Sequence, residues 1–496
     1  MSGFFVESWS LDFACPILVS MSSPTIVWFR QDLRLHDNAA LAAALEQARN
    51  IVPLYIWAPE EEKDRPVGGA SKWWLHHALA DLAQQLQHYS LRLIIRQGPT
   101  EKALREVAKE TGALRIYWNR RYEPQTIQRD SRLKSQLQDD GFAVESFNSS
   151  LLVEPWRVAK QGGGPYKVYT PYSKEVLSHP LPDPVQVPVE TAIGPNKWPA
   201  SLELEQLALL PKIPWDRGFY DAWNPTRKGG IERMQRFVER DAAHYEQQRN
   251  LPGEDGTSRL SPYLHHGQLG PREVVAALGK RAEKGGGHTF LKELIWREFG
   301  YHILYHFPKT PRESLNERFR EFPWVDDPKS LQAWQKGQTG YPIVDAGMRQ
   351  LWQTGWMHNR VRMVVGSLLV KHLLIGWQEG EAWFWDTLVD ADLASNVLGW
   401  QWVAGSGADA APYFRIFNPM TQAEKFDPEG AYIRRWVPEL AKLPNKYLQA
   451  PWTAPANVLE YAGVELGEHY PWPIIDHRKG RQRALDAFER VKKGNR

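Results

Sequence analysis

The chain has 496 residues, of which 42% are hydrophobic and 24% charged, a composition typical of folded globular proteins rather than of disordered or fibrous ones. The sequence holds no run approaching the about 18 apolar residues of a membrane-spanning helix. Its net charge of +3 gives no overall signal for nucleic-acid binding, although a local basic patch is compatible with it. The single cysteine, Cys15, excludes an internal disulfide and a multi-cysteine metal site and favours a reducing compartment.

The first residues do not resemble a targeting signal. Residues 1–20 lack a basic start, and Glu7 and Asp12 interrupt their apolar stretch, so neither a secretory nor an Arg-rich transit peptide fits. We therefore expect residues 1–23 to be an N-terminal extension that carries no function, with Met21 as a candidate start, in a cytoplasmic protein.

Short apolar runs alternate with helical stretches from Thr25 onward. Strands separated by helices require crossover connections, which are right-handed and give a parallel sheet. We predict a Rossmann-like α/β domain at residues 24–150 with a five-stranded parallel sheet, formed by the runs Ile26–Phe29, Ile51–Trp57, Leu91–Ile95, Leu114–Trp118 and Phe142–Phe147.

The composition changes after this domain. Residues 152–228 hold 12 of the 36 prolines, and because proline fixes φ and lacks a backbone donor, residues 151–228 are predicted to be a long extended linker. Helical periodicity dominates afterwards, so residues 229–496 are predicted to form an all-α domain. Its candidate helices are Gly229–Arg249, Arg272–Glu283, Thr289–His306, Val344–Gln353, Met357–Leu374 and Glu381–Leu388.

Two patterns point to cofactors that their context disfavours. Gly405–Ala410 matches G-x-G-x-x-A, but a dinucleotide-binding loop must follow a strand, and this segment lies in the helical domain. The α/β domain has no such glycines after its first strand, which disfavours a nicotinamide enzyme. His302 and His306 have the spacing of two metal ligands, but Ile303 stands where H-E-x-x-H requires glutamate, so no metal site is predicted.

A short segment of the helical domain combines three kinds of side chain. Glu293, Trp296 and Arg297 fall on one face of a predicted helix. A carboxylate, an indole and a guanidinium together suit a flat, partly polar guest such as a nucleobase. A solvated helix edge with an exposed tryptophan is the alternative interpretation.

Two further segments add polar groups in unusual settings. Asn359 and Met363 share a helix face and could line a base pocket, although Met363 could equally fill the core. Asp390 and Asp392 repel each other unless they are exposed or paired, and Arg362 is a natural partner for them.

These segments, together with Val27–Asp37, Asp255–Ser261 and Pro412–Pro419, resemble in their order the photolyase/cryptochrome family of flavoproteins. The resemblance extends from about Thr25 to Lys479 and is to cyclobutane pyrimidine dimer photolyases of the type related to plant cryptochromes. It implies an α/β antenna domain, a long linker and a helical catalytic domain that holds a U-shaped FAD.

The same resemblance implies roles for residues at the cofactor. Asn396 falls where the family places the group that faces flavin N5, and Trp324, Trp377 and Trp400 match a tryptophan relay that photoreduces the flavin from the surface inward. The implied FAD contacts are Tyr245, Thr257, Ser258, Arg259, Leu260, Ser261, Trp356, Asn359, Arg362, Asp390, Asp392 and Asn396.

The implied activity is that of a deoxyribodipyrimidine photolyase, a carbon–carbon lyase that repairs dimers in UV-damaged DNA by electron transfer from reduced FAD. The catalytic residues implied are Glu293, Asn359, Met363, Trp296 and Trp402. The DNA-binding residues implied are Arg249, Glu293, Trp296, Arg297, Asn359, Arg360, Trp402, Arg415 and Gln422. We expect a monomer that acts without an obligate protein partner or a membrane.

Three other functions fit the sequence less well than repair of this lesion. (6-4) photolyases carry histidines where this chain has Asn359 and Met363, and proton transfer near neutrality needs imidazole. A cryptochrome photoreceptor is the stronger alternative, because Val397-Leu398-Gly399 is closer to plant cryptochromes than the Asn-Gly-Gly of common photolyases. Plant cryptochromes, however, place aspartate at Asn396 and lack the Glu293 pocket. A generic single-strand or damaged-DNA binding module would not account for the flavin contacts.

The antenna pigment is less constrained. In some dimer photolyases an Asn-Glu pair that follows a Tyr-Glu sequence binds folate. This chain has the Tyr-Glu sequence, at Tyr122-Glu123, but Gln125 and Thr126 occupy the positions of the Asn-Glu pair. Methenyltetrahydrofolate, bound in a different mode, is favoured over a deazaflavin.

Overall fold

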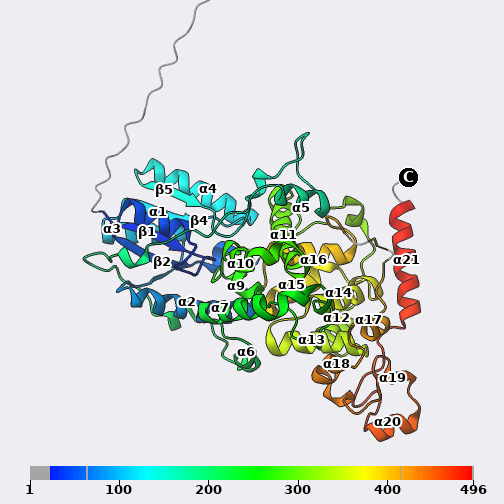
Figure 1. The fold of residues 1–496 in the computed structure, drawn as a ribbon. Helices are drawn as coiled ribbons and strands as arrows, with labels where there is room; N and C mark the ends of the chain where they lie inside the picture. The colour runs from blue at the N-terminus through cyan, green and yellow to red at the C-terminus, as the bar shows by residue number, and fades with distance from the viewer. Residues whose placement is uncertain (1–22, 63–64, 411, 414, 494–496) are drawn as a thin grey trace, which may run out of the picture.

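The computed structural model describes residues 23–62, 65–410, 412–413 and 415–493. Residues 1–22 of the expected N-terminal extension, with Cys15 and Met21, lie outside the described residues. Two bodies are visible in Figure 1, an α/β body at the N-terminal end and a larger helical body, which are in contact along one side.

The N-terminal body contains the predicted five-stranded parallel sheet, in the order β3-β2-β1-β4-β5. Its strands are β1 (Thr25–Phe29), β2 (Ile51–Trp57), β3 (Ile94–Gln97), β4 (Arg115–Asn119) and β5 (Ala143–Phe147). The connecting helices are α1 (Ala39–Gln47), α2 (Gly69–His88), α3 (Thr100–Thr111) and α4 (Pro124–Asp139). Val27 and Phe29 enter one hydrophobic cluster whereas Ile26 and Trp28 enter another. Both faces are therefore covered, which explains why the central strands β1 and β2 are buried throughout and almost entirely apolar.

The predicted extended linker contains helices that the sequence interpretation did not foresee. They are η2 (Pro155–Arg157), α5 (Tyr169–Leu177), η3 (Val189–Thr191), η4 (Leu204–Leu207) and α6 (Arg217–Ala222). In α5, Tyr169, Tyr172 and Val176 are buried at helical spacing. This apolar stripe packs on the helical domain and favours a helix despite the prolines around it.

The helical domain is built around α11 (Gly285–His306), which is buried on most of its surface and packs against α16 (Leu393–Ala404). The predicted helix at 229–249 is broken into α7 (Arg227–Arg236), η5 (Phe237–Asp241), η6 (Ala242–His244) and α8 (Tyr245–Gln248). The remaining elements up to residue 387 are α9 (Ser261–His265), α10 (Pro271–Leu278), η7 (Gly279–Glu283), η8 (Glu317–Glu321), α12 (Pro328–Gln335), α13 (Pro342–Thr354), α14 (Asn359–Ser367), η9 (Leu368–His372) and α15 (Trp377–Thr387).

The chain ends in a group of short helices and one long one. These are α17 (Pro419–Phe426), α18 (Ala431–Trp436), η10 (Pro438–Leu440), α19 (Asn445–Leu448), η11 (Pro451–Thr453), α20 (Ala456–Ala462) and α21 (His477–Lys493). Helix α21 packs against η9 along the side of the domain farthest from the sheet (Figure 1). No helix in the described part of the chain is long and apolar enough to span a bilayer.

The two domains touch backbone to backbone at two glycines. A Cβ atom at Gly68 would lie 2.2 Å from the carbonyl oxygen of Trp385, and one at Gly267 would lie 2.0 Å from that of Gln31. Gly267 also has a φ of +69°, which side chains other than glycine rarely adopt. The interface therefore admits no side chain at either position.

Candidate active site

Asp390 joins the residues predicted to surround the cofactor. Its carboxylate accepts hydrogen bonds from Nη2 of Arg362, at 2.9 and 3.1 Å, and from Oγ of Ser261 at 2.6 Å. The pairing of Arg362 with an aspartate that the sequence suggested is present. Residues from α9, α14 and the start of α16 are thereby fixed around one carboxylate.

Asp392 caps the N-terminus of α16 and lies deeper in the domain. Its Oδ1 accepts the N–H of Ser395 at 2.8 Å, and its Oδ2 accepts the hydroxyl of Tyr301. Burial favours the neutral acid, but the neighbouring Arg297 and His265 outweigh it and hold the pKa of Asp392 below its usual value. Asp392 is therefore an anion that orders the helix carrying Asn396 and Trp400.

Asn396 is oriented by two residues that the sequence interpretation missed. Its Nδ2 donates to Oε1 of Glu381 at 2.9 Å and to the Glu381 carbonyl at 3.1 Å. Glu381 is buried, and Arg65 of the α/β domain binds both of its carboxylate oxygens at 2.6 and 2.7 Å. Burial raises the pKa of Glu381, and Arg65 opposes that rise. An interdomain ion pair thus fixes the amide of Asn396.

The segment before α9 presents small hydroxyl side chains in a tight loop. Ser258 Oγ accepts the N–H of Leu260 at 3.4 Å, and Arg259 adopts a φ of +50° that turns the chain. The Arg259 guanidinium lies 4.9 Å from the ring centroid of Trp356. Hydroxyls, backbone amides and a guanidinium are suited to bind phosphate oxygens.

Several buried polar atoms around these residues have no hydrogen-bond partner among the described protein groups: His265 Nδ1, His358 Nε2 and Trp400 Nε1. His265 lies close enough to Asp390 and Asp392 for both carboxylates to influence its pKa. Because buried polar atoms are almost always paired, unpaired atoms beside the predicted FAD residues fit a site completed by a polar ligand such as FAD.

Glu293 and Trp296, which the spacing predicted on one face of a helix, are both partly exposed on α11. Oε1 of Glu293 is 2.6 Å from Nη1 of Arg249, and both side chains are about one quarter exposed, at 28% and 25%. Burial raises the pKa of Glu293, and Arg249 opposes the rise. Trp296 is half-buried and accessible in part.

The remaining predicted pocket residues lie on α14 and α16. Asn359 is exposed at the first residue of α14, and Met363 follows one turn later, half-buried, with its sulfur 3.8 Å from Nη1 of Arg360. Trp402 is half-buried near the C-terminal end of α16.

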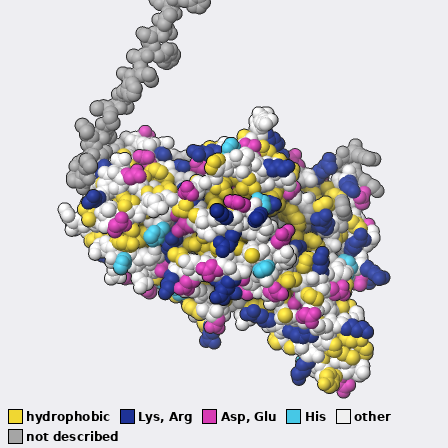
Figure 2. Space-filling model, viewed as in Figure 1, with side chains coloured by type: hydrophobic (Ala, Val, Ile, Leu, Met, Phe, Trp, Pro, Cys, Tyr) yellow, Lys and Arg dark blue, Asp and Glu magenta, His cyan; other side chains and the backbone are white. Residues whose placement is uncertain are grey.

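The predicted DNA-binding residues differ in exposure and in whether other protein groups already bind them. Arg297 is turned inward, where its Nη1 donates to the carbonyl of Ser150 at 2.8 Å and its guanidinium lies 5.0 Å from the ring centroid of Tyr301. Arg360 is held by Asn250, whereas Arg415 is exposed and Gln422 is half-buried on α17. Figure 2 shows one face hollowed near its middle, with Lys and Arg side chains gathered beside the hollow.

The three relay tryptophans gather at the first turn of α15. Trp377 begins this helix and is fully buried, with its Nε1 donating to Oγ of Ser314 at 3.2 Å. A Cβ atom at Gly380 would lie 2.1 Å from Cη2 of Trp400, and one at Gly376 would lie 3.9 Å from Cγ of Trp324. Because Trp324 is half-exposed whereas Trp377 and Trp400 are buried, the set leads from the surface inward.

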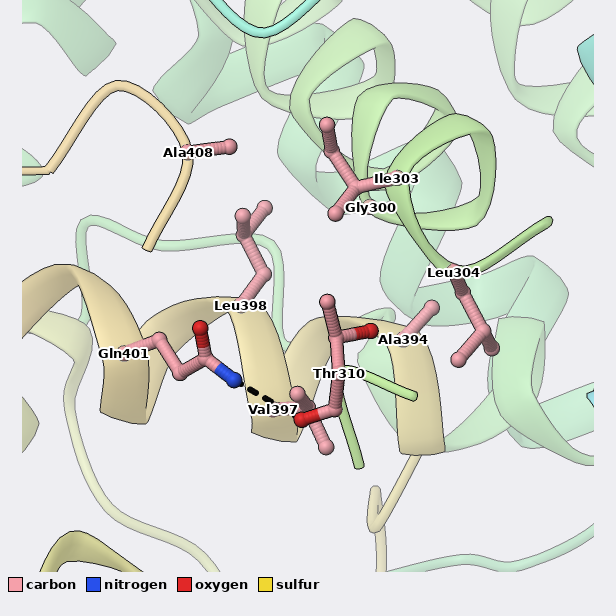
Figure 3. A pocket seen from close by; sticks show the side chains of 9 residues that line it. All are labelled: Gly300, Ile303, Leu304, Thr310, Ala394, Val397, Leu398, Gln401 and Ala408. Carbon is pink, nitrogen blue, oxygen red and sulfur yellow. Dashed lines mark hydrogen bonds between the residues drawn. The ribbon is translucent and has the colours of Figure 1, made fainter. Parts of the chain in front are cut away.

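Two hollows lie elsewhere and do not include these residues. A cavity of about 10 Å³ between α11 and α16 is lined mainly by aliphatic side chains, with Gln401 donating to the Thr310 carbonyl at its edge (Figure 3). This volume holds at most one water molecule, so the cavity is a packing defect. A wider groove of about 810 Å³ carries both Lys309 and Glu313, among other charges.

The crevice where ligands usually bind in this kind of sheet is bordered by side chains that hydrogen-bond to one another. It lies between β1 and β4, where the strand order reverses. There Nδ2 of Asn119 donates to Asp32 at 2.6 Å and to Asn38 at 2.7 Å. Tyr122 donates to Glu154 at 3.0 Å. The Asn119 and Tyr122 side chains therefore serve internal contacts.

Comparison with known proteins identifies the family. Residues 25–189 match the family described as "DNA photolyase", and residues 290–490 match "FAD binding domain of DNA photolyase". The chain is 50% identical over 476 residues to the deoxyribodipyrimidine photo-lyase of Agrobacterium fabrum, covering 95% of this chain and 99% of the relative. It is 39% identical over 490 residues to Cryptochrome-2 of Arabidopsis thaliana, covering 96% and 80%.

A solved structure agrees with these relatives. The bacterial class III photolyase from Agrobacterium tumefaciens superposes with a TM-score of 0.92 at 48% identity, covering 97% of this chain and all of that one, 100%. The chain therefore belongs to the photolyase/cryptochrome family, and its helical domain is the FAD-binding domain of that family.

Proposed function

We propose that this protein uses light to repair cyclobutane pyrimidine dimers in DNA, as a deoxyribodipyrimidine photolyase. The observation that carries the proposal is that Glu293, Trp296, Asn359, Met363 and Trp402 are all at least partly exposed on α11, α14 and α16, and that α16 packs against both other helices. The high identity to a named photo-lyase over 99% of its length supports it. The inward-turned Arg297 is the weakest member of the proposed DNA contacts.

Bound FAD in its fully reduced form would supply a light-driven one-electron donor. The residues that would hold it are Tyr245, Thr257, Ser258, Arg259, Leu260, Ser261, Trp356, Asn359, Arg362, Asp390, Asp392 and Asn396. The Arg362–Asp390–Ser261 contacts fix three of these relative to one another before any ligand arrives. Such preorganisation lowers the ordering cost of binding.

The pocket residues would receive the flipped dimer. An enzyme that acts on a base must take it out of the duplex stack, and aromatic surfaces at Trp296 and Trp402 can replace the lost stacking. Because burial raises the pKa of Glu293, its carboxyl group is better able to stay protonated and to donate to a dimer carbonyl. A donor there stabilises the negative charge of a dimer that has accepted an electron.

The reaction is balanced without any group leaving the dimer. The two carbon–carbon bonds of the cyclobutane ring break, two pyrimidines are restored, and the added electron leaves again. Arg249, Arg360, Arg415 and Gln422 would hold the flanking phosphates, which is independent of sequence.

The pigment of the α/β domain is a separate proposal. We infer methenyltetrahydrofolate, held away from Asn119 and Tyr122 because those side chains already bind Asp32, Asn38 and Glu154. Mass spectrometry of the pigments released from purified protein would identify it. We further propose a monomeric, cytoplasmic enzyme with damaged DNA as its partner.

The test uses purified protein, chemically reduced and mixed with an oligonucleotide bearing one thymine cyclobutane dimer. Dimer loss is followed under blue light and in the dark. Loss only in the light, with flavin absorbance on the protein, supports the proposal. If the flavin is photoreducible but the dimer survives, the cryptochrome function replaces it; if no flavin is bound, a damaged-DNA binding module does.

A further inference from the structure

Trp296 is one half of a stacked aromatic pair. Its ring lies face to face with that of Tyr169, the first residue of α5 in the linker, with centroids 3.8 Å apart and planes 5° from parallel. Tyr169 is only 8% exposed, whereas Trp296 is half-buried. The tyrosine therefore covers one face of the indole, and part of the indole remains accessible.

Tyr169 is itself held by α11. Its hydroxyl donates to the carbonyl of Lys292 at 2.8 Å, one residue before Glu293. Phe299 meets both rings edge-on, with its centroid 6.0 Å from Tyr169 and 5.7 Å from Trp296. The three rings form one rigid unit on the pocket side of the helix.

The same linker segment also contacts the loop that follows the helix of Trp402. The N–H of Asp409 donates to the carbonyl of Lys167 at 3.0 Å. Asp409 lies in the loop that follows α16, the helix that carries Trp402. Residues 167–169 therefore connect the helix of Trp296 with the end of the helix of Trp402.

We propose that Tyr169 is a positioning residue, which holds the Trp296 indole in one orientation as a preformed surface for the flipped dimer. The inference rests on the proposed function of the Trp296 pocket. A side chain ordered before binding loses less conformational freedom when the lesion arrives, so the pair acts on affinity for the dimer rather than on affinity for the DNA backbone.

The first experiment measures binding of the FAD-loaded protein in the dark to matched oligonucleotides with and without a dimer. We expect Tyr169→Ala to weaken dimer binding about fivefold, the range of one aromatic pair, and to leave undamaged DNA unchanged. Tyr169→Phe keeps the stack and should stay within about twofold of wild type. Tyr169→Leu keeps apolar volume without the stack, and it replaces the alanine variant if that variant fails to fold.

A control variant separates stacking from general linker damage. Tyr166→Ala removes a linker ring that contacts Tyr172 and His302, at 6.2 and 6.4 Å, but not Trp296. It should bind the dimer like wild type. Equal weakening by Tyr166→Ala and Tyr169→Ala would overturn the proposal.

A double-mutant cycle tests whether Tyr169 acts through Trp296. In a Trp296→Ala background, Tyr169→Ala should cause no further loss of dimer affinity. A loss of the same size in both backgrounds would contradict positioning, as would a Tyr169→Leu variant that binds like wild type. A wild-type protein without preference for the dimer would instead refute the proposed function itself.

Discussion

A backbone contact fixes which ring nitrogen of His358 carries the proton. Its Nδ1 accepts the N–H of Arg360 at 3.1 Å and caps α14. Burial and the surrounding arginines lower the pKa of His358 to about 3, so the ring is neutral near neutral pH. A neutral ring that accepts at Nδ1 carries its proton on Nε2, the buried atom without a protein partner. The Nε2–H of His358 is therefore available to donate to a bound ligand.

His358→Asn tests this donor. Asparagine is a good N-cap and keeps the contact with the helix, but it lacks the distal N–H. We expect FAD to bind about tenfold more weakly, because a buried acceptor is left unpaired, with little change in unfolding temperature. The FAD dissociation constant is measured by flavin fluorescence on dilution of the loaded protein. His358→Ala should in addition cost ~1 kcal/mol of stability. Unchanged FAD affinity in His358→Asn would show that Nε2 has no ligand partner.

Glu293→Ala should lower the repair yield about tenfold or more, because a donor to the developing charge is lost, while the bound flavin spectrum stays the same.

Glu293→Gln keeps an N–H donor at every pH. Since burial raises the pKa of Glu293 and acid favours its protonated form, the wild-type yield should rise as the pH falls, whereas that of Glu293→Gln should not. Yields per absorbed photon at saturating dimer measure both effects; an unchanged yield in Glu293→Ala would remove its catalytic role.

At the scale of elements, the first turn of α15 brings the three predicted relay tryptophans together. The helix begins with Trp377, and glycines lie where the other two indoles approach. Gly380 gives Trp400 its place, since any side chain there would overlap the ring. The helix thus brings together tryptophans from the loop before α12 and from α16. The residues of the proposed dimer pocket, by contrast, lie on α11, α14 and α16.

Trp377→Phe should block photoreduction of oxidised flavin and leave repair by already reduced enzyme intact, because phenylalanine is much harder to oxidise than tryptophan. Flavin absorbance under illumination and dimer loss after chemical reduction are the two measurements. Trp334→Phe serves as a control, because Trp334 is also buried, at 6.1 Å from Trp400 in edge contact, but does not lie at Gly376 or Gly380. Failure of repair by reduced Trp377→Phe would refute the separation of relay and pocket.

Some features of the structure can be recognised from the sequence, and others cannot. The sheet was predictable because short, mainly apolar runs alternate with helical stretches, and burial on both faces makes β1 and β2 almost entirely apolar. Helix α5 was missed because its three buried hydrophobic residues are a weak signal among prolines. The pairing of Glu381 with Arg65 was missed for another reason. The two residues lie 316 positions apart, and no local pattern links them. The pairing of Arg362 with Asp390, by contrast, followed from charge alone.

For the whole molecule, buried neutral histidines make stability depend on pH. Burial lowers the pKa of His302 and of His372 to about 4. In the unfolded chain the same groups titrate near pH 6.5, so the unfolded state binds more protons between these values. Stability therefore falls as the pH drops below about 6.5, by ~1.4 kcal/mol per pH unit for each such histidine once it titrates fully.

The urea midpoint should accordingly be lower at pH 5 than at pH 7.5. His372→Gln should reduce that difference, because glutamine does not titrate yet can still bond to His477, which lies 2.9 Å from His372. His88→Gln, at an exposed histidine, should leave it unchanged. Equal differences in wild type and His372→Gln would show that His372 contributes nothing to the acid sensitivity.

The two glycine contacts between the domains bear on optics as much as on packing. Resonance transfer of excitation depends on the separation and mutual orientation of two transition dipoles, and hinge motion between their carriers would average that orientation. Gly68 lies against Trp385 and Gly267 against Gln31, and such close backbone packing opposes a hinge motion of this kind. A pigment bound in the α/β domain would therefore transfer its excitation to the flavin in a constant geometry. A bulky residue at either glycine would lower the efficiency of this transfer before it affected the reaction at the flavin.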